Sequence, residues 1–180
     1  MALDFDGIDD EINHGAISAM STAYDQWSVS MWVNAQSFTN TDAIWSKWAS
    51  NIGVVLQYAG TGGAYRIAFD NWVPLVTTST LLSTGQWTHI LCTYDGDNAT
   101  TTNRVQIYNN GVLQNPTVAG AIPAATAATT WGFQVADMGA LGVDFTDIQV
   151  AHLMVWSGSS AAMLTADQAR QQYWSYRPVV

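Results

Sequence analysis

The sequence predicts an all-β protein, a sandwich or barrel of short strands with one short helix near the C-terminus. Three observations carry this prediction. Short segments rich in β-branched and aromatic residues recur along the 180 residues, turn-forming residues separate these segments, and a helix-capping sequence lies near the end of the chain. Many short strands at such a spacing are typical of sandwiches and barrels, whereas alternating strands and helices would indicate a parallel sheet.

Six segments are the clearest predicted strands. Their β-branched and aromatic side chains favour an extended backbone. Turns rich in glycine, aspartate and asparagine, such as residues 60–63 and 95–98, separate them. The predicted strands are residues 27–33, 53–58, 65–69, 87–94, 104–108 and 148–156.

Residues 104–115 predict a β-hairpin. Asn110 and Gly111 stand between two apolar segments, and this pair accepts the positive φ angles of a two-residue hairpin turn.

The predicted helix begins near Thr165. Thr165 and Gln168 fit a capping box, in which each residue satisfies a backbone N–H of the other. We expect the helix to end at about Tyr173 or Trp174 and to turn Leu164, Ala169 and Tyr173 toward a sheet, with Trp174 as a further candidate for that face.

The composition limits the class of partner. Five Lys and Arg oppose 14 Asp and Glu, which gives a net charge of −9, and 48% of the residues are hydrophobic. So few cations cannot follow a phosphate backbone, and an anionic membrane surface would repel the chain. We therefore expect neither a nucleic acid nor a membrane as partner. The length of the chain predicts a single domain that spans residues 1–180.

The N-terminal sequence and the single cysteine bear on whether the protein is secreted. The first residues lack the basic start and apolar stretch of a secretory signal, so either general secretion is not used or a signal has been removed. Cys92 is the single cysteine, which excludes an internal disulfide, and its strand setting predicts a small buried hydrophobe.

The ordered set of motifs resembles the concanavalin A-like, laminin-G-like jelly-roll domains over nearly the whole chain. The resemblance implies two antiparallel sheets packed face to face, and therefore an all-β jelly-roll sandwich with one short C-terminal helix. Because this fold carries lectins, glucanases and viral surface proteins, function must be argued from individual sites. The segments that carry the resemblance are residues 2–12, 27–33, 87–96, 105–111, 147–156 and 164–173.

The number and placement of the carboxylates bear on whether the protein is a glycosidase. The glucanases of this fold use paired carboxylates, usually two glutamates, that flank the scissile bond. Glu11 is the single glutamate here, and Asp9 and Asp10 stand in a predicted turn, where aspartate is a common turn residue. We therefore expect no enzymatic activity and keep an unusual glycoside hydrolase as a minor alternative.

Three tryptophans near predicted turns are the candidate ligand-binding residues: Trp45, Trp48 and Trp72. Trp45 and Trp48 are three residues apart, so on a strand they point to opposite faces, and we expect one of them to be exposed. An exposed indole can stack on the apolar face of a sugar. Packing beneath a loop is the alternative.

The resemblance also implies a candidate calcium site, because lectin-like members of this fold often hold Ca²⁺ through loop oxygens. Asp95, Asp97 and Asn98 are the candidate ligands for such an ion. Calcium takes six to eight oxygens, more than this turn supplies alone, and solubilising surface charge is the other explanation of the aspartates.

The C-terminal residues 173–180 are aromatic and apolar where a tail is usually polar. Either they pack back on the sandwich or they touch a partner, so Trp174, Tyr176 and Arg177 are candidate partner contacts. Open sheet edges also allow copies of the chain to associate.

The predicted function is that of a non-enzymatic bacteriophage virion surface protein. The closing segment resembles those of phage virion proteins, which assemble in the host cytoplasm, where disulfides are rare. Such a protein would decorate or cement a capsid, with a capsid or other virion protein as partner, or present a glycan-binding face. The alternative is a stand-alone bacterial lectin-like module that binds polysaccharide outside the cell.

Overall fold

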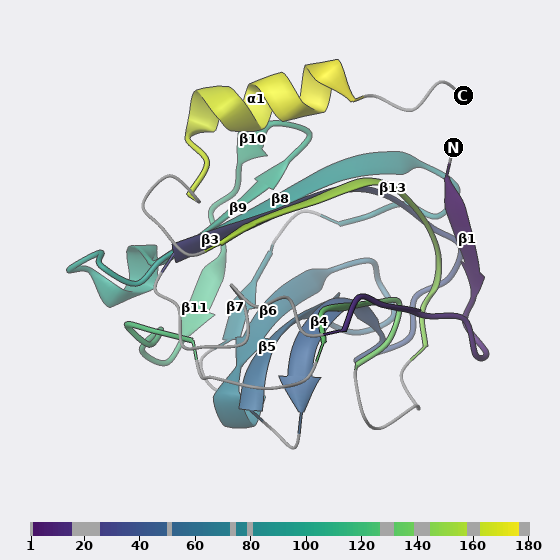
Figure 1. Ribbon diagram of the computed structural model, residues 1–180, viewed down its shortest axis with the longest axis horizontal. Coiled ribbons are helices and arrows are strands. Elements are labelled where there is room, and N and C mark those ends of the chain that lie inside the picture. The colour runs from purple at the N-terminus through teal and green to yellow at the C-terminus, as the bar shows by residue number, and fades with distance from the viewer. Residues whose placement is uncertain are drawn as a thin grey trace.

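The computed structural model describes residues 2–15, 26–49, 52–72, 75–78, 81–126, 132–138, 145–157 and 163–176. Within these residues two antiparallel sheets stack face to face, and one helix lies over the outer face of one sheet (Figure 1). The predicted jelly-roll sandwich with one short C-terminal helix is confirmed. None of the described helices is long and apolar enough to cross a membrane.

The six-stranded sheet is built around β3 and β8, the pair that runs from Gln26 opposite Asp95 to Asn34 opposite Trp87. The register of β13 against β3 shifts between Ala151 and Met154, where a bulge interrupts the ladder. The order across this sheet is β1 (Leu3–Asp6), β13 (Asp147–Ser157), β3 (Gln26–Ala35), β8 (Trp87–Asp95), β9 (Val105–Asn109) and β10 (Val112–Leu113).

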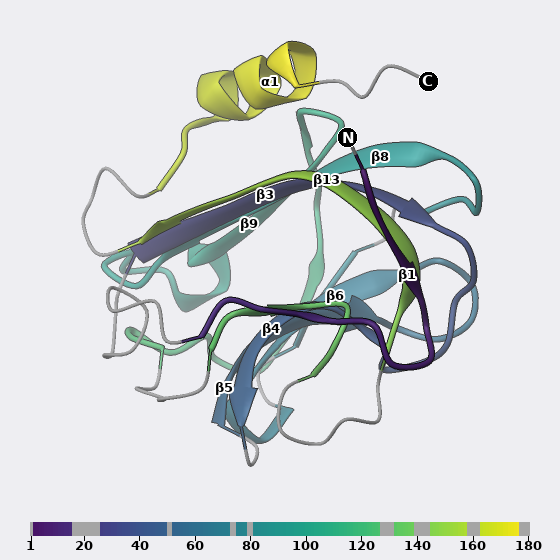
Figure 2. The same ribbon diagram turned by 45° about the vertical axis from the view of Figure 1, so that its right-hand side comes forward.

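The seven-stranded sheet forms the second layer, which the turned view separates clearly from the first (Figure 2). Two short 3-10 turns, η2 (Asp70–Trp72) and η3 (Thr101–Asn103), follow β6 and precede β9. The order across this sheet is β11 (Thr117–Ala119), β7 (Leu75–Thr77), β6 (Tyr65–Phe69), β5 (Ile52–Tyr58), β4 (Ala43–Ala49), β12 (Gln134–Val135) and β2 (Ile12–Asn13).

An aromatic core fills the space between the sheets. Side chains alternate along β3, so that Trp27, with Val29 and Met31, points inward. The Trp27 ring stacks on Tyr94 at 5.4 Å between centroids and meets Trp45 edge-on at 5.7 Å. Cys92 is buried in the same core, and burial raises the pKa of its thiol well above the ordinary value, which confirms the prediction of a small buried hydrophobe.

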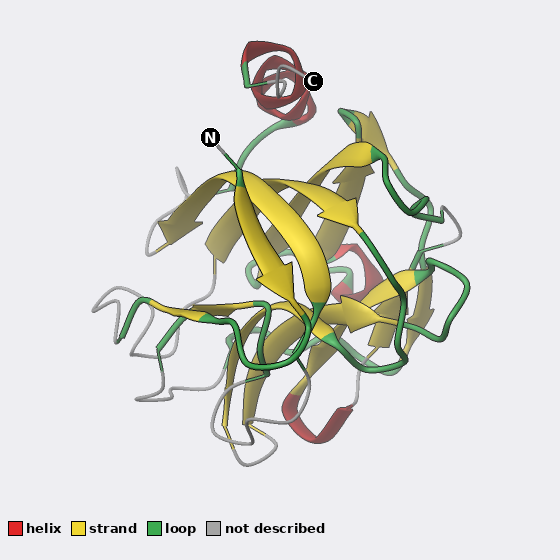
Figure 3. Ribbon diagram, turned by 90° about the vertical axis from the view of Figure 1, so that its right-hand side faces the viewer, coloured by secondary structure: helices red, strands yellow, loops and turns green. Residues whose placement is uncertain are grey.

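Helix α1 (Ala166–Ser175) covers the outer face of the six-stranded sheet (Figure 3). The predicted capping box is present: the Thr165 hydroxyl accepts from the Gln168 N–H, and the Gln168 side chain accepts from the Thr165 N–H. Leu164 and Ala169 pack in a buried cluster with residues of β8 and β9. Tyr173 stacks on a tryptophan of β3 at 5.4 Å, as expected for the buried side of this helix.

The predicted hairpin joins β9 to β10. Asn109 pairs with Val112 across a turn in which Asn110 and Gly111 have φ angles of 50° and 75°. Both angles are positive, as a tight hairpin turn requires. The Asn110 side chain also accepts from the His89 N–H at 2.9 Å, which ties the turn to the neighbouring strand.

Candidate ligand-binding site

Trp45 and Trp48 lie on opposite faces of β4, as predicted. Trp45 belongs to the core between the sheets, and Trp48 belongs to a second cluster on the outer face of the seven-stranded sheet. The expectation that one of them is exposed is wrong, because their exposed fractions are 0% and 1%. The half-buried Trp72 packs over Trp48 at 4.8 Å between ring centroids, so the outer face of this sheet is covered at that point. Neither buried indole can stack on a sugar.

The turn with Asp95, Asp97 and Asn98 uses its oxygens for its own structure. Asp95 Oδ1 accepts from the Gln26 side chain at 3.0 Å and from the Asp97 N–H at 3.2 Å. Asn98 Oδ1 accepts from the Thr100 N–H at 3.0 Å. The oxygens that remain fall short of the six to eight that calcium takes. A calcium ion at these three residues would need backbone or water oxygens as well, and it stays a prediction. The described part of the chain holds no group of three or more His, Cys, Asp or Glu arranged to bind a metal.

Two of the three predicted partner contacts are exposed. The exposed fractions of Trp174 and Tyr176 are 66% and 39%, at the end of helix α1. The Tyr176 ring lies 5.6 Å from the His152 ring of β13, so it packs partly on the sandwich. Arg177 lies outside the described residues.

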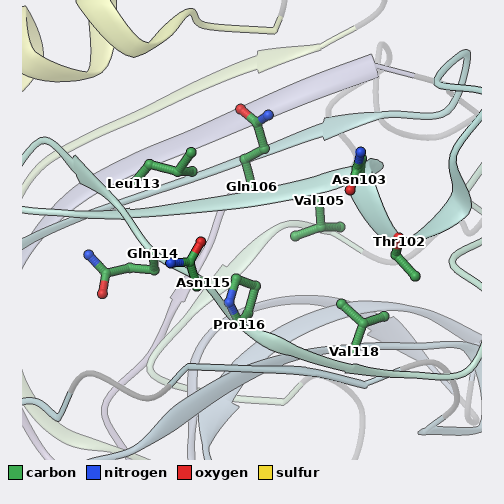
Figure 4. A pocket seen from close by; sticks show the side chains of 9 residues that line it. All are labelled: Thr102, Asn103, Val105, Gln106, Leu113, Gln114, Asn115, Pro116 and Val118. Carbon is green, nitrogen blue, oxygen red and sulfur yellow. The ribbon is translucent and has the colours of Figure 1, made fainter.

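A pocket of about 310 Å³ opens at one edge of the sandwich (Figure 4). It lies between β10, the edge strand of the six-stranded sheet, and β11, the edge strand of the seven-stranded sheet. Sequence analysis did not single out any of its residues. We call this pocket the amide cleft, because asparagine and glutamine side chains dominate its polar lining. The cleft is lined by Thr102, Asn103, Val105, Gln106, Leu113, Gln114, Asn115, Pro116 and Val118.

The amide cleft forms because β10 separates from β9 after two residue pairs. Leu113 is the last paired residue of β10, and the Gln114 N–H then donates to the Ile107 carbonyl at 2.8 Å. Pro116 has no N–H to continue the ladder, and the chain crosses to the other sheet, where β11 pairs with β7. The first residues of β9 are therefore left without a strand neighbour on this side.

Because β10 separates from β9, the backbone of Val105 is left facing the cleft. Backbone groups of alternate residues on a strand point to the same side. Ile107 uses its carbonyl toward β10, whereas the Arg104 carbonyl accepts from Asp95 on the β8 side. By this alternation the N–H and C=O of Val105 point into the gap that β10 vacates, and offer one donor and one acceptor to a ligand.

The side chains of the cleft come from three separate segments. Figure 4 shows Asn103 of η3 on one side and Asn115 of the β10–β11 connection on the other, whereas the Gln106 side chain points from β9 to the side away from Asn115 and Val118. Each amide offers both a donor and an acceptor. The Gln106 side-chain oxygen accepts from the Tyr108 hydroxyl at 2.8 Å, on the face of the sheet that packs against helix α1.

The cleft is electrically neutral. None of its described lining residues carries a charge, and four of them, Val105, Leu113, Pro116 and Val118, supply apolar surface. Arg104 is adjacent in sequence to two lining residues, but its guanidinium donates to the Asn98 carbonyl at 3.0 Å and to the Ile122 carbonyl at 2.7 Å. The arrangement suits a ligand that has many hydroxyl groups and no charge.

The opposite edge of the sandwich offers a different surface. A smaller hollow of about 180 Å³ there is lined by aliphatic side chains of both sheets and by two histidines, His14 and His152. Such a lining presents few groups that could recognise hydroxyls, so the amide cleft is the stronger candidate for a polar ligand.

Two carboxylates do approach each other outside the cleft. Glu11 and Asp137 both accept from the side-chain nitrogen of Gln134, at 3.0 and 3.2 Å. Asp137 is buried with an exposed fraction of 2%, and the amide of Gln134 stands between the two carboxylates. A pair of catalytic carboxylates has to flank a bound glycosidic bond. Neither of these carboxylates lines the amide cleft.

Solved structures share this fold. A heptameric SAP-like pentraxin from Limulus polyphemus matches with a TM-score of 0.66 at 15% identity, over 96% of this chain and 81% of the pentraxin chain. Trypanosoma rangeli sialidase in complex with sialic acid matches with a TM-score of 0.68 at 12% identity. That match covers 97% of this chain but only 27% of the sialidase, so the chain spans about a quarter of that enzyme.

A carbohydrate complex is among the similar structures. Domain 4 of the extracellular arabinanase AbnA from Geobacillus stearothermophilus, in complex with arabinotriose, matches with a TM-score of 0.54 at 20% identity. The match covers 85% of this chain and 68% of that domain's chain. Identities this low show a shared fold and nothing further.

Sequence comparison places the chain in a family. No curated protein sequence matches it. The family model described as the concanavalin A-like lectin/glucanases superfamily matches residues 6–168, which is most of the chain. The chain therefore belongs to the concanavalin A-like lectin/glucanases superfamily.

Proposed function

We propose that the protein is a lectin-like carbohydrate-binding module without catalytic activity, and that the amide cleft holds the glycan. The observation that carries this proposal is an uncharged pocket of about 310 Å³ whose polar side chains are amides and one threonine hydroxyl, and whose remaining side chains are apolar. A sugar ring presents hydroxyls that both donate and accept, together with apolar C–H faces. Amides match the hydroxyls, and Leu113 and Val118 match the C–H faces.

The absence of catalysis is part of the proposal. Hydrolysis of a glycoside by carboxylates needs two of them positioned on either side of the bound sugar. None of the described lining residues of the amide cleft is acidic. A ligand held there would meet hydrogen-bonding groups and no general acid.

One similar structure supports a sugar as the class of ligand: the arabinanase domain is in complex with arabinotriose. The pentraxin of this fold is heptameric, which supports a homo-oligomer for the present protein as well.

The proposal is tested by measuring retention on a panel of immobilised polysaccharides, followed by titration calorimetry with the fragments that bind. Asn115→Ala and Asn103→Ala each remove one amide from the cleft. Loss of one hydrogen bond costs about 0.5–1.5 kcal/mol. Each variant should therefore weaken binding by about 2- to 10-fold, since 1.4 kcal/mol is a factor of ten. Gln171→Ala removes an exposed amide from helix α1 and should leave the affinity unchanged. No retention on any polysaccharide would overturn the proposal.

A bacteriophage virion surface protein is the second candidate function. The observation that favours it is the exposed Trp174, 66% accessible at the end of helix α1. Large aromatic side chains are the commonest anchors of protein interfaces. The chain should then co-sediment with capsids assembled from the coat protein encoded beside it, and Trp174→Ala should reduce the bound fraction. Failure of the wild-type chain to co-sediment would refute this function and would leave the glycan-binding proposal untouched.

A further inference from the structure

We infer that the amide cleft selects uncharged glycans and rejects sugars that carry a carboxylate, such as sialic and uronic acids. This inference rests on the proposed carbohydrate-binding function and specifies the class of sugar at the same site. It follows from where the protein places its few cations and from what the cleft offers in their place.

None of the cations that the structure describes lines the cleft. The sequence contains five Lys and Arg against 14 Asp and Glu. Lys47 is buried in β4 with an exposed fraction of 1%. Arg66 of β6 lies opposite Gln57 of the neighbouring strand β5 in the seven-stranded sheet. Arg170 pairs with Asp167 at 3.3 Å on the exposed side of helix α1. None of these three lines the cleft.

The nearest cation in sequence is already occupied. Arg104 stands between Asn103 and Val105, yet its guanidinium donates to two backbone carbonyls, at 3.0 and 2.7 Å. Moving this guanidinium into the cleft would leave both carbonyls without these donors. A carboxylate that enters the cleft would lose water and gain no opposite charge, and an unpaired charge is expensive to desolvate.

For a neutral polyol, the cleft replaces hydrogen bonds that the hydroxyl groups make to water. Asn103 and Asn115 each bring a full amide from opposite sides. The backbone of Val105 adds a donor and an acceptor. Sugar hydroxyls donate and accept in equal measure, so they can use both kinds of group, whereas a carboxylate accepts only.

The test compares matched neutral and acidic oligosaccharides by calorimetry. Suitable pairs are lactose with sialyllactose, and galactan fragments with galacturonan fragments of equal length. The wild-type protein should bind the neutral member of a pair at least about tenfold more tightly, which corresponds to 1.4 kcal/mol. Asn115→Lys places a cation at an exposed position of the cleft and should narrow or reverse that ratio.

Two further variants make the result specific to the cleft. Asn103→Lys changes the charge at a second, exposed lining position, in case the connection that carries Asn115 does not tolerate a lysine. Gln171→Lys makes the same charge change on helix α1 and should leave the ratio as it is in the wild type.

The outcomes separate the inference from the function on which it rests. Binding to neither member of any pair would refute the carbohydrate-binding function itself. Equal or tighter binding of the acidic member by the wild type would refute the neutral specificity and leave the function standing. An identical shift in Gln171→Lys and in both cleft variants would show that overall charge, and not the cleft, sets the preference.

Discussion

Protonation of His89 should destabilise the folded protein at acidic pH. His89 is buried in β8 with an exposed fraction of 1%, and its ring lies between Trp32, at 5.4 Å, and Tyr173 of helix α1, at 6.2 Å. Its Nε2 contacts the Ser30 hydroxyl at 2.8 Å, while Nδ1 has no hydrogen-bond partner within the described residues. Burial of this ring lowers the pKa of His89 from 6.5 to about 4.

The direction of the effect follows from which state takes up the proton first. Between pH 6.5 and about pH 4 the unfolded chain binds a proton on His89 that the folded chain excludes, so the free energy of unfolding falls as the pH falls. This contribution to stability is complete above pH 6.5 and is lost below about pH 4. At about 1.4 kcal/mol for each pKa unit, the loss amounts to about 3 kcal/mol.

The assay is urea unfolding of the wild type and of His89→Gln at several pH values between 7 and 4. Contributions to stability that do not involve His89 cancel when the two proteins are compared. The advantage of the wild type over the variant should shrink by about 3 kcal/mol across this range. His14→Gln removes an exposed histidine and serves as the control. A difference between wild type and His89→Gln that stays constant with pH would refute the reasoning.

Three further predictions concern the stability of the sandwich and are read from urea or thermal unfolding. Trp27→Ala removes a fully buried indole of the core and should cost about 3–5 kcal/mol, whereas Trp174→Ala at an exposed position should change stability by less than about 0.5 kcal/mol; equal costs would contradict the assigned burial. Gly53→Ala should destabilise by roughly 1–3 kcal/mol, because Gly53 has a φ of 127° and a Cβ there would collide with the Lys47 carbonyl oxygen; a neutral effect would refute that strain. Thr165→Ala removes the cap of helix α1 and should cost about 0.5–2 kcal/mol, with Thr165→Ser retaining most of the stability; no loss would show that the cap contributes nothing.

Local features of the fold could be predicted because their causes are local in the sequence. The hairpin follows from the Asn110–Gly111 pair, whose backbone accepts positive φ angles wherever it occurs. The helix start follows from Thr165 and Gln168, which satisfy each other's backbone groups within one turn. The alternation that places Trp27 in the core is likewise a property of the strand itself.

The fate of individual aromatic residues was decided by packing between distant elements. Trp48 has a position on β4 that would suit an exposed side chain, but Trp72 covers it after the chain has passed through β5 and β6. Tyr173 and Trp174 are neighbours of similar chemistry. Tyr173 stacks on Trp32, whereas Trp174 remains 66% exposed, because the helix turns only one of them toward the sheet.

The sequence by itself determined that strands of this composition build an acidic, aromatic-cored sandwich with one capped helix, because residue type and spacing alone set those local preferences. Only the tertiary structure decided where a ligand could be held. Asn103 and Asn115 have no shared motif and line one cleft because the chain leaves one sheet at Pro116 and enters the other. That crossing depends on how the two sheets pack, and no spacing of residues along the chain records it.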